Sequence, residues 1–190
     1  MVQRVSDYAR IERDRYETPE WVTDALLPYI PKMQWIWEPA CASGKMSRAL
    51  KKNHPVYSSD LVTDYGITNT DFLKSELPLN INAIITNPPF NREAEKFIRH
   101  GLKLLAPVPD YFMAMLLPID FDSGKTRRDM FEDAAHFAGK IVLTSRIVWI
   151  EKDGAAPTTN HAWYFWDKRH TAFTSPNIYY HFTRKQTKEL

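Results

Sequence analysis

The sequence contains a single cysteine, Cys41, and no long apolar run. One cysteine excludes an internal disulfide and is typical of a protein from a reducing compartment. No segment approaches the roughly 20 apolar residues that a membrane-spanning helix needs. Residues 1–15 are charged and lack the apolar core of a secretory signal. We therefore expect a cytoplasmic protein that does not associate with membranes.

Neither the charge balance nor the histidines indicate a ligand. The 25 Lys and Arg residues nearly balance the 23 Asp and Glu residues, and a net charge of +2 is too small to predict nucleic-acid binding alone. The six histidines are scattered, so we expect no metal site. A chain of 190 residues that is 44% hydrophobic predicts one domain, residues 16–190, after a charged arm, residues 1–15.

Short apolar segments alternate with helical patterns along the chain. The segments with strand character are 34–38, 56–61, 82–86, 111–117, 140–150 and 161–166. Helical spacing follows Thr18-Pro19, begins again at Met46, and covers 91–106. This alternation predicts an α/β, Rossmann-like fold with a mostly parallel sheet and helices on both faces. A polar loop joins the last two strands, which predicts an antiparallel strand at one edge.

The sequence Asn87-Pro88-Pro89-Phe90 directly follows the predicted strand 82–86. Prolines have no backbone N–H, so the strand must end there, at the sheet edge where such folds bind ligands. An asparagine oxygen can accept a hydrogen bond from the exocyclic amine of a planar substrate. Phe90 can stack on the same flat group. The alternative is an ordinary strand-ending turn with a buried phenylalanine.

A loop of small residues, 39–45, follows the predicted strand 34–38. Small side chains allow a cofactor to approach the backbone closely. A phosphate-binding loop would need Gly at Pro39 and Ser or Thr at Met46, so that class of site is excluded. The sequence Gly-Lys-Thr at 124–126 fails the same test, because Ile119 occupies the first glycine position. A cofactor without phosphates, with adenosine and amino-acid ends, fits this loop better.

Two acidic residues occupy positions that suit a nucleoside. Asp60 ends the predicted strand 56–61, about 20 residues after Glu38, where an acid commonly accepts hydrogen bonds from ribose hydroxyls. The alternative is that Asp60 caps the residues that follow. Asp71 precedes Phe72 after a polar loop, and a simple helix N-cap explains Asp71 nearly as well.

These motifs, in the order X, I, IV, resemble those of S-adenosylmethionine-dependent adenine-N6 DNA methyltransferases of the small phage type. Asn-Pro-Pro-Phe resembles motif IV of the amino-methyltransferases. The resemblance implies that the catalytic residues are Asn87, Pro88, Pro89 and Phe90. It also implies transfer of a methyl group to the N6 amino group of an adenine that is flipped out of duplex DNA.

The same resemblance implies a set of residues that bind S-adenosylmethionine. Glu-Pro-Ala-Cys-Ala-Ser-Gly resembles motif I, which implies roles for Glu38, Ala40 and Gly44. Thr18 and Pro19 lie in a segment that resembles motif X, which contacts the methionine end of the cofactor. Asp71-Phe72 resembles motif III, which implies that Asp71 binds the adenine amino group and that Phe72 packs on the ring. Asp60 would bind the ribose.

Target recognition is where the sequence departs from this family. Related enzymes commonly carry a separate target-recognition domain, and we expect none within 16–190. This implies weak specificity, a very short recognition site, or a partner protein. Three basic residues after the predicted strand 111–117 are candidate phosphate contacts, with a solvated helix start as the equal alternative: Lys125, Arg127 and Arg128.

Other functions are compatible with parts of the pattern. Asn-Pro-Pro-Phe also suits methylation of another planar amine, such as guanine N2 in ribosomal RNA or a protein glutamine. A catalytically inactive nucleic-acid-binding relative is a third alternative. Intact Glu38 and Asn87 argue against it, and a nucleotide-binding NTPase is disfavoured because both phosphate-loop candidates fail.

Overall fold

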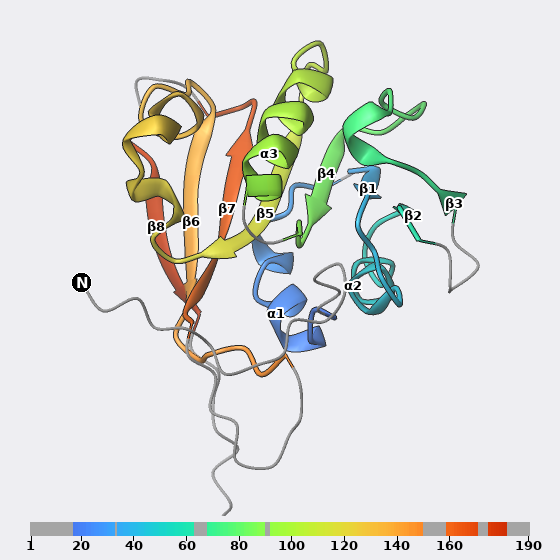
Figure 1. Ribbon diagram of the computed structural model, residues 1–190, viewed down its shortest axis with the longest axis horizontal. Coiled ribbons are helices and arrows are strands. Elements are labelled where there is room, and N and C mark those ends of the chain that lie inside the picture. The colour runs from blue at the N-terminus through green and yellow to red at the C-terminus, as the bar shows by residue number, and fades with distance from the viewer. Residues whose placement is uncertain are drawn as a thin grey trace, which may run out of the picture.

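The computed structural model of the protein describes residues 17–32, 34–62, 68–89, 92–149, 159–170 and 175–181. Within these residues, eight strands form one sheet in the order β3-β2-β1-β4-β5-β7-β6-β8 (Figure 1). The strands are β1 (Ile36–Glu38), β2 (Val56–Asp60), β3 (Thr68–Asn69), β4 (Ala83–Thr86), β5 (Phe112–Pro118), β6 (Phe137–Leu143), β7 (His161–Asp167) and β8 (Asn177–His181). The helices are α1 (Glu20–Asp24), α2 (Lys45–Leu50) and α3 (Arg92–Leu105), with 3₁₀ turns η2 (Leu27–Tyr29), η3 (Phe72–Lys74), η4 (Phe121–Ser123) and η5 (Lys125–Met130).

The sheet is parallel except for one strand. β7 runs antiparallel to both of its neighbours, β5 and β6, and β8 pairs parallel with β6 at the outer edge. The predicted mostly parallel sheet with antiparallel pairing towards one edge is therefore confirmed. The predicted strand 140–150 was misplaced, because β6 begins at Phe137 and ends at Leu143. The outermost strand β8 arises from a short apolar run that we had not assigned to a strand.

Helices cover both faces of the sheet, as predicted (Figure 1). Because side chains alternate along a strand, β5 contributes to both cores. Met113 and Met115 pack in the cluster that includes the apolar face of α3. Phe112 and Ala114 pack in the opposite cluster, which includes apolar residues of α1 and α2. The cores on the two faces hold β5 between them, with every residue from Phe112 to Leu117 buried.

The parallel strands bring the segments that follow them to one edge of the sheet. β1, β2, β4 and β5 point the same way, so the residues after each strand meet at this carboxyl edge. β7 is antiparallel, and its first residue, His161, pairs with Pro118 at the end of β5. Within the described part of the chain, no helix is both long and apolar enough to cross a membrane.

Candidate functional site

A cavity opens at the carboxyl edge, between the loop after β1 and the segment that leads into α1. Its lining comprises Glu17, Thr18, Glu38, Ala40, Cys41, Ala42, Ser43, Lys45 and Met46. Three residues that the sequence pattern had selected therefore line one cavity: Thr18, Glu38 and Ala40. Pro19 is the N-cap of α1, next to Thr18, and the helix starts at Glu20.

Of the two acids that line the cavity, Glu38 has the pKa that departs more from its ordinary value. It ends β1, is only 1% exposed, and accepts a hydrogen bond from the Ser47 hydroxyl. Ser47 Oγ in turn lies 2.5 Å from Ser58 Oγ. Burial raises the pKa of Glu38 from 4.5 to about 8, and the nearby charge of Asp60 contributes to the increase. At neutral pH this carboxyl is protonated, and a cationic ligand group would favour its ionised form.

Asp60 and Gly44 shape the loop rather than line the cavity. The two Asp60 oxygens accept hydrogen bonds from the backbone N–H groups of Ala42, at 2.9 Å, and Val62, at 3.0 Å. Ala42 has a positive φ of 45°, and Gly44 has a φ of 78° immediately before α2. Both oxygens of a carboxylate have further lone pairs, so Asp60 retains the capacity to accept from a ligand.

Asp71 and Phe72 do not line the cavity. Asp71 Oδ1 accepts a hydrogen bond from the Leu73 N–H at 3.1 Å, which makes Asp71 the N-cap of η3, the alternative that local sequence had left open. Phe72 is 2% exposed, and its ring lies 5.1 Å from that of Trp37 and 4.7 Å from that of Phe97. The Phe72 ring thus packs in the core in this structure.

The Asn-Pro-Pro segment leaves the carboxyl end of β4. Asn87 is half-buried, Pro88 is buried and Pro89 is half-buried, whereas Phe90 lies outside the described residues. β4 pairs directly with β1 through Trp37 and Ile84. Asn87 therefore follows the strand next to the one whose loop forms the cavity.

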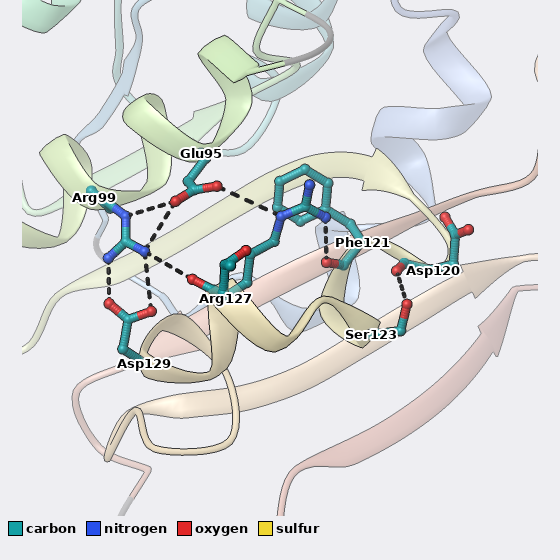
Figure 2. Close-up of polar contacts among 8 residues, drawn as sticks. Glu95, Arg99, Asp120, Phe121, Ser123, Arg127 and Asp129 are labelled. Atoms are coloured by element: carbon teal, nitrogen blue, oxygen red, sulfur yellow. Dashed lines mark hydrogen bonds and ion pairs between the residues drawn. The ribbon is translucent and has the colours of Figure 1, made fainter.

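The three basic candidates on η5 differ in their surroundings. The Arg127 guanidinium lies 3.9 Å from the centre of the Phe121 ring, donates to the Phe121 carbonyl at 2.9 Å and approaches Glu95 of α3 (Figure 2). Arg128 pairs with Glu132 at 2.8 Å. Lys125 is exposed and has no ion-pair partner among the described residues. Of the three, Lys125 is the best placed for an external phosphate.

Sequence reasoning missed two charged residues of the cavity. Glu17 and Lys45 form an ion pair, and this contact with Lys45 holds the pKa of Glu17 below its usual value. The only sequence feature that could have indicated them is their position beside predicted cofactor residues, since Glu17 precedes Thr18 and Lys45 follows Gly44. Trp163 is fully buried and donates to the Val22 carbonyl at 2.7 Å, which ties β7 to α1.

No group of three or more His, Cys, Asp or Glu side chains in the described ranges could hold a metal ion. The candidate site consists of the cavity after β1 and the Asn-Pro-Pro segment after β4. A buried acid, a neighbouring ion pair and small loop residues give the cavity both signs of charge. Asn87 follows the strand that is adjacent to the one whose loop lines the cavity.

No protein-family model matches the sequence, and no curated protein sequence is significantly similar to it. Solved structures do resemble the fold. A putative class I S-adenosylmethionine-dependent methyltransferase from Listeria monocytogenes is 14% identical with a TM-score of 0.57, over 92% of this chain and 67% of that chain. A modification subunit of a putative type I restriction enzyme from Vibrio vulnificus YJ016 is 12% identical with a TM-score of 0.59, over 83% of this chain and 45% of that chain.

The 23S rRNA methyltransferase ErmE is 12% identical with a TM-score of 0.57, over 84% of this chain and 72% of that chain. Thus the chain spans less than half of the modification subunit but most of ErmE. At these identities the likeness concerns the fold. The described residues have the Rossmann-like fold of the class I methyltransferases.

Proposed function

We propose that the protein transfers the methyl group of S-adenosylmethionine to the N6 amino group of adenine in DNA. The observation that carries this proposal is the position of Asn87, directly after β4 and next to the strand whose loop lines the cavity. An amide that accepts from a substrate amine and a cavity for an amino-acid end thus lie on adjacent strands. The likeness of the fold to class I methyltransferases supports the same reaction class.

The cavity residues fit the amino-acid end of this cofactor. Buried Glu38 suits an α-ammonium group, because a positive partner favours the ionised carboxylate. Thr18 and Ala40 line the same space, while Asp60 and Gly44 hold the loop in shape. When bound, S-adenosylmethionine supplies an electrophilic methyl group on a sulfonium. Asp60 is proposed to accept hydrogen bonds from the ribose hydroxyls in addition to those from the loop.

The Asn-Pro-Pro segment is proposed to orient the base. The side-chain oxygen of Asn87 and the backbone carbonyl of Pro88 would each accept one N–H of the adenine amine, which draws the nitrogen lone pair out of the ring system. The two prolines restrict the backbone that carries these acceptors. Phe90 would stack on the flipped base. Positioning would supply most of the rate enhancement.

DNA contacts are proposed for η5 and for a partner. Lys125 is the candidate phosphate contact, and Arg128 is exposed close by, whereas Arg127 keeps η5 attached to α3 (Figure 2). The type I modification subunit is more than twice the length that this chain matches. We propose that a partner subunit adds sequence specificity to the DNA binding of this chain.

The decisive experiment is methylation of unmethylated duplex DNA, digested to nucleosides and analysed by mass spectrometry. We expect N6-methyladenine with wild type and none with Asn87→Ala, while cofactor binding persists in the variant. Asn53→Ala, which changes an exposed asparagine after α2, is the matched control and should retain activity. Cofactor binding without any methylated DNA base would exclude the DNA adenine proposal.

An RNA base amine is the second candidate substrate. The observation that favours it is the likeness to ErmE, which this chain matches over 72% of its length. The same assay, run with RNA in place of DNA, separates the two. Methylated RNA with unmodified DNA, both dependent on Asn87, would assign the enzyme to RNA.

A further inference from the structure

Glu17 and Lys45 face each other across the cavity that is proposed to hold the cofactor's amino-acid end. Glu17 precedes α1, Lys45 is the first residue of α2, and both line the cavity. Their side chains form an ion pair that joins the two segments. Lys45 is the one cation among the lining residues, whereas Glu17 and Glu38 are both acids.

This ion pair is suited to exchange. The side chains of Lys45 and Glu17 are 52% and 34% exposed, and ion pairs in such solvated positions contribute little net stability. Ser43 lines the same cavity as Glu17, so its hydroxyl can donate to Glu17 if Lys45 turns away. Lys45 can therefore be redirected to another carboxylate at small cost.

An α-amino-acid end carries one carboxylate and one ammonium group. The two acids of the cavity can meet the ammonium, but only Lys45 among the lining side chains can meet the carboxylate as a counter-ion. We infer that Lys45 exchanges Glu17 for the α-carboxylate of the bound cofactor and so makes the site selective for a cofactor that retains this carboxylate. The inference rests on the proposed function and adds a specificity-determining residue to it.

The test compares two cofactors that differ only in this group. Dissociation constants of S-adenosylmethionine and decarboxylated S-adenosylmethionine are measured by calorimetry for wild type and for Lys45→Met. Wild type should bind the complete cofactor about tenfold more tightly, as expected for one charge-assisted contact. Lys45→Met should lose about tenfold for the complete cofactor and keep its affinity for the decarboxylated one within about twofold.

A second ion pair between the same segments provides the matched control. Lys52, which lies just after α2, pairs with Glu20 of α1 but does not line the cavity. Lys52→Met should leave the preference between the two cofactors unchanged, and Lys45→Arg should retain it because the charge remains. Equal losses for both cofactors in Lys45→Met, or no loss, would overturn the role of Lys45. Absence of binding to either cofactor in wild type would overturn the proposed function itself.

Discussion

The carboxylate of Asp60 accepts a hydrogen bond from the backbone N–H of Ala42 at 2.9 Å. This contact joins the end of β2 to the loop after β1, at a residue whose φ is 45°. Alanine rarely adopts this conformation, because the left-handed region costs it about 1 kcal/mol. The acid that was selected as a ribose ligand thus also holds the cofactor loop in its shape.

Replacing Asp60 tests how much its contact with the loop contributes to stability. We expect Asp60→Ala to lower the free energy of unfolding by about 1–3 kcal/mol, since the Ala42 N–H loses a charged acceptor. Asp60→Asn keeps an oxygen for Ala42 and should recover most of that loss. Urea denaturation of the cofactor-free variants measures both the loss in Asp60→Ala and its recovery in Asp60→Asn. If Asn destabilises the protein as much as Ala, the loop contact is not what Asp60 contributes.

Glu38 predicts a pH dependence of stability. Its pKa is about 8 in the folded protein against an ordinary value of 4.5. Between these values the unfolded chain has lost the proton and the folded chain keeps it. The free energy of unfolding should therefore fall as pH rises through this window, by up to about 1.4 kcal/mol per pH unit from this group. The stabilisation is fully present below pH 4.5 and is lost by about pH 8.

The matched variant for this prediction is Glu38→Gln. It removes the titration, so its unfolding free energy should change less between pH 5 and pH 8 than that of wild type. Urea denaturation at several pH values gives the difference between the two proteins. Parallel curves would mean that Glu38 titrates near its ordinary value in the folded state.

Gly139 should be irreplaceable in the pairing of β6 with β8. Its φ is 148°, and a Cβ there would lie 2.1 Å from the Asn177 carbonyl oxygen. We expect Gly139→Ala to cost at least about 2 kcal/mol and to accelerate hydrogen exchange in β8. Gly124→Ala is the control, because the nearest atom to its Cβ is 3.5 Å away, in Arg127. Similar stabilities for the two variants would contradict the strand pairing.

On η5, we expect Lys125 to contact nucleic acid and Arg127 to stabilise the fold. Lys125→Ala should reduce the slope of log affinity against log salt concentration by about 1 and leave stability unchanged. Arg127→Ala should instead lower stability by about 1–2 kcal/mol, since it loses the Phe121 contacts. Lys103→Ala, at the far end of α3, is the control for affinity. An unchanged slope in Lys125→Ala would remove this residue from the proposed interface.

Sequence patterns predicted β4 and β5 well, because buried parallel strands are continuous apolar runs with clear ends. The segment 111–117 became β5, and the prolines after Thr86 end β4 as expected. β6 was placed too late, since the apolar residues of 144–150 share its composition. β8 was missed, because its apolar run is short and only Tyr179 and His181 of its five residues are partly buried.

The candidate site was predictable only where local sequence determines placement. Thr18, Glu38 and Ala40 adjoin strand and helix ends, and the fold carries them to one cavity. The Phe72 ring could not be assigned, because a ligand-stacking phenylalanine and a core phenylalanine are the same residue type. The pair of Glu17 and Lys45 joins positions far apart in the chain, and such contacts depend on how α1 and α2 pack.

The direction of β7 determines where this fold can acquire new surface. Because β7 starts beside Pro118, the chain leaves β6 and re-enters the sheet at the same edge as the cavity and the Asn-Pro-Pro segment. Residues 159 and 160, which lead into β7, are exposed at this edge, so side chains placed there could contact a substrate beside the proposed site.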